Sequence, residues 1–289
     1  MRLGNALGTL VLSIAAACVA ARADAPERVT FPSQDGKTAL IGYVFKLDPM
    51  PDARVPAVVM MHGRAGAYST QAAGVYDAST LSQRHRLWGQ LWAKSGYLAM
   101  LVDGFGPRGY ASGFPRFSYQ DRPPEVDEVN VRPLDAYGAL AYLRTRPDVV
   151  GDRVALQGWS NGASAALAAM SIDTPARRAP APLSFRAAIA FYPTCGLKGH
   201  FEEGYRPYAP VQIFHGSADE EVSPTRCRRF VDVSRAIGGN IEIRIYDGAS
   251  HGFDDPGQRR QRIRANAEAA EDAIRRAQRF VSRMLRDKD

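Results

Sequence analysis

Lysine and cysteine are scarce in this chain, and several patterns that assign a function at once are missing. Only five of the 37 basic residues are Lys, and no basic block with interleaved aromatic residues indicates a nucleic-acid groove. No His, Cys or Asp cluster has metal-ligand spacing, and no G-x-G-x-x-G motif follows a predicted strand. We therefore expect no metal, no cofactor and no nucleic-acid partner.

Beyond the N-terminus, no apolar run has the length of a membrane span. Residues 6–20 are mostly apolar after a positively charged start, and residues 21–25 contain two A-x-A cleavage patterns. This is typical of a secretory signal peptide. We favour cleavage after Ala23, because the other pattern would place Pro26 directly after the cut.

The apolar run is too short for a good transmembrane span, so we expect no stable membrane span. Cys18 leaves a lipoprotein alternative open, although Ala15 stands where a lipobox normally has Leu. We expect a signal peptide over residues 1–23, a single domain over residues 24–289, and a periplasmic or secreted protein. The oligomeric state stays open.

Two cysteines, Cys195 and Cys227, remain after the leader. In an oxidising compartment they suggest one disulfide, because both follow strands predicted to be neighbours; two separate buried thiols are the alternative. The net charge is +7. It fits either a solvated Arg-rich surface or attraction for acidic partners.

Apolar runs alternate with amphipathic stretches along the chain. We predict strands over residues 28–31, 39–45, 55–61, 97–102, 153–156, 185–192, 211–214 and 241–246. We predict helices over residues 82–95, 133–144, 163–170, 223–237 and 258–286. The pattern predicts an α/β fold with a mainly parallel central sheet flanked by helices, and a hairpin of the first two strands at its edge.

Two helices have a predicted buried face, and one long segment has no periodicity. Leu87, Trp88, Leu91 and Trp92 share a face of the first helix, and the last helix carries an apolar face that begins at Ile263. Residues 105–132 are rich in Gly, Pro, Arg and aromatic residues. Because this segment follows the carboxyl end of a strand, we expect it to cover a site.

The chain is organised around Gly158-Trp159-Ser160-Asn161-Gly162, a G-x-S-x-G motif between a predicted strand and a predicted helix. In a nucleophile elbow the serine lies on a tight, strained turn, and the glycines let the strand and the helix approach each other. The helix N-terminus directs its free N–H groups towards the serine oxygen. An ordinary serine in a Gly-rich turn is the alternative.

Ser160, Asp219 and His251 each follow a predicted strand, in the chain order of α/β-hydrolases. Because ligands bind at the carboxyl ends of parallel strands, we expect the three side chains to meet there. His251 would take the serine proton, and Asp219 would orient the imidazole. Glu220 and Glu221 are nearby rivals for the acid.

Asp103 is a weaker rival for the acid, at the end of a different strand. The negative charge that develops on a substrate carbonyl needs preorganised N–H donors, and we assign these to Asn161 and Arg64. His62 is expected to pack beneath the loop that follows its strand. His85 is expected at the surface.

At these residues the chain resembles the dienelactone hydrolases. The resemblance rests on residues 58–63, 103–109, 158–162, the segment that ends at Asp219, and residues 250–253. It implies a compact α/β-hydrolase fold and cofactor-independent hydrolysis of a small ester or lactone. The founding enzymes use a cysteine nucleophile, whereas Ser160 stands here, and their glutamate near the oxyanion loop has no counterpart in His62-Gly63-Arg64. A broader esterase is therefore expected.

Several residues are candidates for substrate binding. Arg64 and Arg108 could hold a substrate carboxylate, with loop–loop hydrogen bonding as the alternative. Tyr68, Tyr110 and Trp159 could line an aromatic pocket. The competing functions are a peptidase of the prolyl-oligopeptidase kind, and a non-catalytic ligand-binding homologue.

Overall fold

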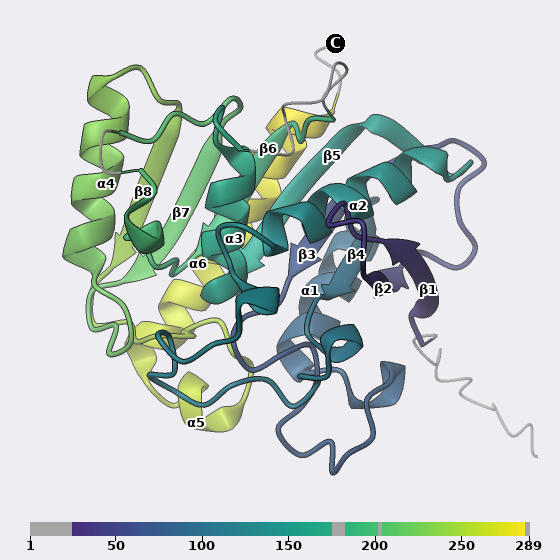
Figure 1. Ribbon diagram of the computed structural model, residues 1–289, viewed down its shortest axis with the longest axis horizontal. Helices are drawn as coiled ribbons and strands as arrows, with labels where there is room; N and C mark the ends of the chain where they lie inside the picture. The colour runs from purple at the N-terminus through teal and green to yellow at the C-terminus, as the bar shows by residue number, and fades with distance from the viewer. Residues whose placement is uncertain (1–24, 175–182, 202–203, 287–289) are drawn as a thin grey trace, which may run out of the picture.

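The computed structural model describes residues 25–174, 183–201 and 204–286. In these ranges eight strands form one sheet with helices on both faces (Figure 1). The strands are β1 (Glu27–Pro32), β2 (Ala39–Phe45), β3 (Val55–Met61), β4 (Leu98–Asp103), β5 (Val149–Trp159), β6 (Ala187–Phe191), β7 (Val211–Gly216) and β8 (Ile241–Tyr246). The α-helices are α1 (Gln83–Lys94), α2 (Arg132–Thr145), α3 (Asn161–Met170), α4 (Pro224–Ala236), α5 (Gln258–Gln261) and α6 (Arg264–Leu285). Short 3-10 helices lie in the loops: η1 (Ala78–Thr80), η2 (Gly106–Arg108), η3 (Pro124–Val126) and η5 (Leu197–Gly199).

The strand order confirms the predicted α/β-hydrolase architecture. It runs β1-β2-β4-β3-β5-β6-β7-β8. β2 is antiparallel to both β1 and β4, and the remaining neighbours are all parallel. Since parallel strands end at the same edge of the sheet, the segments that follow β3, β5, β7 and β8 meet at one place.

Two apolar cores lie on opposite faces of the sheet. Helices α2, α3 and α4 cover one face, and α1 and α6 cover the other (Figure 1). In β3, Val59 and Met61 belong to the first core, while Val58 and Met60 belong to the second. Successive strand residues point to opposite faces, so a strand covered on both sides must be apolar throughout. This is why β3 has a continuous apolar run.

The predicted buried face of the first helix is wrong at Leu87. The predicted surface position of His85 is also wrong. Trp88 and Trp92 are fully buried, but Leu87 is 39% exposed. His85 lies on the buried side of α1 and is only 3% exposed. Its Nδ1 lies 2.9 Å from the carbonyl oxygen of Ala67. Burial lowers the pKa of His85 to about 4, so this side chain is a neutral core group at physiological pH.

The last predicted helix is also interrupted. α5 ends at Gln261, and α6 begins at Arg264 with Ile263 as its extended N-cap residue. Ile263 is 44% exposed, so its predicted place on the buried face is wrong. Residues 258–262 are all polar and contain neither Gly nor Pro, so the sequence has no stop signal that would separate the two helices.

Cys195 and Cys227 form a disulfide with their Cα atoms 5.0 Å apart. It joins the loop after β6 to α4. The expected signal peptide and Cys18 lie outside the described residues. In the described parts of the chain, no helix combines the length and the apolar character needed to cross a membrane.

Candidate active site

The turn between β5 and α3 holds Ser160 in a strained conformation. Its φ and ψ are 50° and −115°, a backbone region that non-glycine residues rarely adopt. A Cβ atom on Gly158 would lie 2.2 Å from the carbonyl oxygen of Gly162, and one on Gly162 would lie 2.2 Å from that of Met61. Both glycines are therefore required by close backbone approach, and the turn has the geometry of a nucleophile elbow.

Ser160, His251 and Asp219 form a continuous hydrogen-bonded chain, which we call the candidate triad. Ser160 Oγ lies 3.1 Å from His251 Nε2, and His251 Nδ1 lies 2.8 Å from Asp219 Oδ2. The other carboxylate oxygen, Asp219 Oδ1, accepts backbone N–H bonds from Glu221 and Val222 at 2.9 and 2.8 Å. The Asp219 side chain is fully buried, so its orientation is set by these three hydrogen-bond partners.

The two rival carboxylates occupy other positions. Glu220 Oε2 accepts the backbone N–H of His251 at 2.8 Å, and Arg260 lies 3.1 Å from its other oxygen. Burial raises the pKa of Glu220, but these donors outweigh it and lower the pKa to about 2. Glu221 Oε2 lies 3.9 Å from His251 Nε2, on the serine side of the ring. Asp219 therefore holds the position at Nδ1.

Asp103 and His62 are fixed inside the fold. Asp103 accepts backbone N–H bonds from Phe105 and Gly106 at 3.1 and 2.8 Å, so it ties down the loop after β4. Nδ1 of His62 donates to the carbonyl oxygen of Gly63 at 2.7 Å, and Nε2 accepts from Gly104 N–H at 3.2 Å. Both ring nitrogens are used, and burial lowers the pKa of His62 well below its usual value. His62 is thus a neutral structural group.

The loop after β3 lies directly against the serine. A Cβ atom on Gly63 would lie 3.2 Å from the carbonyl oxygen of Trp159 and 3.5 Å from Ser160 Cβ. In the described residues, the backbone N–H groups of Arg64 and Asn161 make no hydrogen bond to the protein. Two free N–H donors beside a nucleophile are the arrangement that an oxyanion hole requires.

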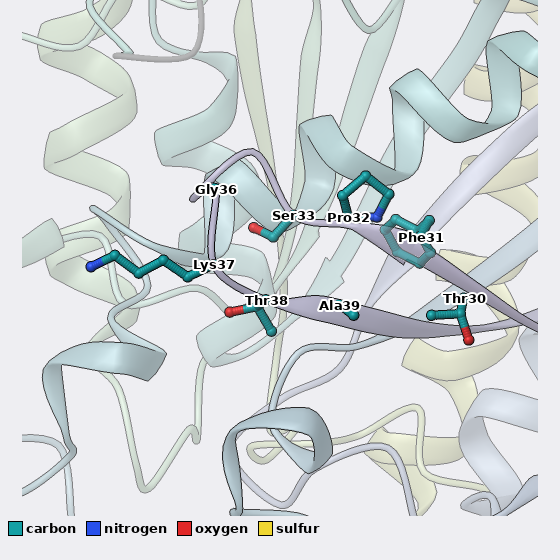
Figure 2. Close-up of a pocket in the computed structure, with 8 residues that line it drawn as sticks. All are labelled: Thr30, Phe31, Pro32, Ser33, Gly36, Lys37, Thr38 and Ala39. Atoms are coloured by element: carbon teal, nitrogen blue, oxygen red, sulfur yellow. The ribbon is translucent and has the colours of Figure 1, made fainter.

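A cleft of about 800 Å³ opens at the candidate triad. Among the described residues that line it are six arginines and two carboxylates: Arg64, Arg84, Arg86, Arg116, Arg259, Arg260, Glu221 and Asp255. A smaller cavity of about 400 Å³ lies at the β1–β2 hairpin and shares no lining residue with the cleft (Figure 2). Among the described residues that line this smaller cavity, Lys37 is the only charged one, so the titratable groups suited to acid–base chemistry lie in the cleft.

A sequence model of the dienelactone hydrolase family matches residues 42–285. The chain belongs to this family. The matched range contains every strand from β3 to β8 and the whole candidate triad. No functionally curated protein matches the sequence.

Solved structures share the same fold. Esterase 2 of the planctomycete Thermogutta terrifontis, phosphorylated by paraoxon, is 20% identical with a TM-score of 0.65, covering 92% of this chain and 98% of the other. The butyrate-bound form of that esterase is 21% identical with a TM-score of 0.64, covering 92% and 97%. A dienelactone hydrolase-like promiscuous phosphotriesterase from metagenomic libraries is 19% identical with a TM-score of 0.64, covering 91% and 100%.

In this member of the dienelactone hydrolase family, three of the five substrate-binding candidates line the cleft. These are Arg64, Tyr68 and Trp159. The indole of Trp159 is nevertheless fully buried, and the hydroxyl of Tyr68 donates to Asp103 at 2.8 Å. The polar atoms of Trp159 and Tyr68 are therefore engaged within the protein.

The other two candidates, Arg108 and Tyr110, are not among the described residues that line the cleft. Arg108 donates to Asp135 at 2.8 Å from two nitrogens, and to Asp35 at 2.7 Å. These bonds join the segment after β4 to α2 and to the β1–β2 turn. The ring of Tyr110 packs 5.3 Å from that of Phe114, within its own loop. Both residues stabilise the segment 105–132.

That segment reaches the cleft through a cluster of ion pairs that the sequence does not reveal. Arg64 Nε and Nη2 donate to the two oxygens of Glu221 at 3.0 and 3.1 Å, while Nη1 donates to the carbonyl oxygen of Phe114 at 3.1 Å. Arg116 Nε lies 2.8 Å from the same carboxylate. Burial opposes the charge, but these arginines and His251 lower the pKa of Glu221. One glutamate thus joins three loops beside the candidate triad.

A second missed group lies behind the imidazole. The ring of Tyr192 lies 4.6 Å from that of His251, and its hydroxyl donates to Asp254 at 2.5 Å. Asp254 also accepts the indole N–H groups of Trp88 and Trp159, at 3.0 and 2.8 Å. An Asp three residues after a histidine gives no sequence signal for this role, because its partners Trp88, Trp159 and Tyr192 are far along the chain.

Proposed function

We propose that this protein is a serine hydrolase that cleaves small carboxylic esters or lactones through an acyl-enzyme on Ser160. The observation that carries the proposal is the hydrogen-bonded chain of Ser160, His251 and Asp219, which opens into a cleft beside two free backbone N–H donors. Membership of the dienelactone hydrolase family supports hydrolysis as the reaction class.

Each step follows from an atom in the site. His251 Nε2 takes the proton of Ser160 Oγ as that oxygen attacks the ester carbonyl carbon. The carbonyl oxygen becomes negative and is stabilised by the N–H groups of Arg64 and Asn161. The imidazolium, held by Asp219, then gives its proton to the leaving alcohol oxygen as the bond to carbon breaks. Water repeats the sequence on the acyl-enzyme and releases the acid.

The cleft favours a small substrate that is neutral or anionic. Its arginines outnumber its carboxylates, and a cationic substrate would meet unfavourable charge. One structural neighbour binds propionate and butyrate, which supports short acyl groups here as well. Arg64 is already engaged by Glu221, so a substrate carboxylate would have to compete for it.

We also propose that the protein is exported and works in the periplasm or outside the cell. The charged start, apolar run and A-x-A pattern of residues 1–23 support export. The disulfide between Cys195 and Cys227 fits an oxidising compartment. N-terminal sequencing of the protein from a periplasmic fraction tests this: a start at Asp24 supports export, and a start at Met1 contradicts it.

Hydrolysis of p-nitrophenyl esters from acetate to octanoate tests the reaction. We expect turnover that falls as the acyl chain lengthens. Ser160→Ala should lower kcat by on the order of 10⁴-fold or more. Ser69→Ala is the matched control, because Ser69 lines the same cleft outside the candidate triad.

A fluorophosphonate probe separates the remaining outcomes. Labelling of the wild type that disappears in Ser160→Ala supports a serine nucleophile. No labelling and no turnover on any ester or lactone of the series would leave a non-catalytic ligand-binding homologue and would refute the proposal. Turnover confined to peptides would indicate a peptidase instead.

A further inference from the structure

Arg132 is a fully buried arginine behind the candidate oxyanion hole. It is the first residue of α2, and none of its surface is exposed. In the part of the chain that the structure describes, its Nε and Nη2 have no hydrogen-bond partner, and no ion pair joins it to a carboxylate. Burial of an unpaired charge is costly, so its retention here calls for a physical reason.

The contacts of this guanidinium supply that reason. Nη1 donates to the carbonyl oxygen of His62 at 2.8 Å and also to Asn161 Oδ1. His62 stands two residues before Arg64 in the loop after β3, and Asn161 directly follows Ser160. A single nitrogen therefore joins the two segments that carry the two candidate oxyanion donors.

Neighbouring groups hold both Asn161 and Arg132 in place. Asn161 Nδ2 donates to Glu128 Oε2 at 3.0 Å, and Glu128 is only 1% exposed. The central carbon of the Arg132 guanidinium lies 4.8 Å from the centroid of the Phe105 ring. The face of that ring stabilises the positive charge. The side chain of Asn161 is thus held from both ends, which limits rotation of the first turn of α3.

Other charges around Arg132 are already engaged. Asp135 is the nearest carboxylate on its own helix, but both of its oxygens accept from Arg108. Asp135 and Glu128 still attract the guanidinium of Arg132, and Arg108 and Arg122 repel it. Burial lowers the pKa of Arg132 to about 10, so it remains a cation at neutral pH.

We propose that Arg132 is the positioning residue of the oxyanion hole: its Nη1 fixes the loop after β3 against the start of α3 and so sets the separation of the Arg64 and Asn161 N–H donors. The proposal rests on the ester hydrolysis proposed above. The guanidinium of Arg132 donates directly to each of the two segments. From there its positive charge also favours negative charge on the substrate oxygen.

The test compares Arg132→Met with Arg132→Lys and with a distant control. Arg146→Met is the control, because Arg146 is also largely buried but pairs with Asp148 and Glu27 away from the cleft. For each variant we would measure kcat and KM on p-nitrophenyl acetate, thermal unfolding, and inhibition by a short alkyl trifluoromethyl ketone. The ketone adds to the serine and places an oxyanion in the hole.

We expect Arg132→Met to lower kcat by roughly ten- to hundredfold with KM changed less than about threefold. Its affinity for the ketone should fall by a similar factor. Arg132→Lys keeps the charge and should recover part of both losses. Arg146→Met should lower the unfolding temperature and leave kcat and ketone affinity unchanged.

Two results would overturn the inference. The first is a folded Arg132→Met protein whose kcat and ketone affinity stay within about twofold of the wild type. If Arg132→Met does not fold, the second is a folded Arg132→Gln protein, which lacks the charge, with kcat and ketone affinity within about twofold of the wild type. Inactive wild-type protein would refute the proposed function and this inference with it, whereas an active wild type with an unaffected Arg132 variant refutes this inference alone.

Discussion

Asp254 offers the sharpest test of how the buried polar groups hold the site together. Its side chain is fully buried, and three hydrogen-bond donors and one arginine surround its two oxygens. Oδ2 accepts the indole N–H groups of Trp88 and Trp159. Oδ1 accepts the hydroxyl of Tyr192 and lies 3.3 Å from Arg84 Nε.

Asp254→Asn keeps the volume of the side chain but cannot satisfy this arrangement. If the new amide nitrogen takes the Oδ2 position, two indole N–H groups face another donor. If it takes the Oδ1 position, the tyrosine hydroxyl can turn and accept, but Arg84 loses its buried counter-charge. The second orientation is the cheaper one, and breaking a buried ion pair costs about 3–5 kcal/mol.

Urea unfolding followed by tryptophan fluorescence measures this loss directly, since Trp88 and Trp159 are fully buried beside Asp254. Asp255→Asn is the matched control. Asp255 pairs with the same arginine, with Nη2 to Oδ2 at 3.2 Å, but its side chain is 42% exposed. An exposed pair contributes about 0–1 kcal/mol, so this variant should unfold near the wild-type midpoint.

The reasoning fails if the unfolding free energies of the Asp254→Asn and Asp255→Asn proteins agree within about 1 kcal/mol. That result would mean that the indole and hydroxyl donors find other partners once the charge is removed. A loss of about 3 kcal/mol or more, with the control unchanged, would establish Asp254 as the group that fixes Tyr192 behind His251.

Two further predictions concern acid stability and the disulfide. The folded-state pKa of Glu220 is about 2, below its ordinary value of 4.5, so its stabilising contribution is present above pH 4.5 and is lost as pH falls towards 2. The difference in unfolding free energy between the wild type and Glu220→Gln should therefore shrink between pH 5 and pH 3, and a constant difference would contradict the assignment. Replacing both Cys195 and Cys227 by Ala opens a link with a sequence separation of 32 residues, which should cost about 3–4 kcal/mol. Thermal unfolding in the presence of a reductant should show a matching loss for the wild type and none for the double variant.

The parts of the site that could be predicted depend on a short motif of consecutive residues and on which residues follow the strands. The glycines around Ser160 mark a close approach of strand and helix, and the structure requires both of them. Asp219 and His251 each follow an apolar strand, and parallel strands bring such positions together whatever the loops do. The chain order of the three residues therefore predicts both the fold and the candidate triad.

The parts that could not be predicted depend on contacts between distant residues. Arg108 looks like a substrate-binding residue because it lies in a loop at a strand end. Its partner Asp135 is 27 residues away and accepts from both terminal nitrogens, Nη1 and Nη2. Glu221 meets Arg64 across 157 residues. No sequence feature shows whether a charged loop residue will pair with a distant residue or face solvent. Only the folded chain distinguishes the two cases.

Asp254 and Arg132 show two different ways in which a buried charge can serve the same site. Asp254 is saturated by donors, so it stabilises the fold as it orients Tyr192. Two nitrogens of Arg132 have no partner among the described residues, so its hold on Asn161 and the His62 carbonyl comes with little gain in stability. The two residues should therefore separate in experiment: Asp254→Asn loses stability first, while Arg132→Met loses turnover at a stability close to that of the wild type. If both variants lost stability and turnover in the same proportion, the distinction between a saturated and an unsaturated buried charge would have no functional meaning here.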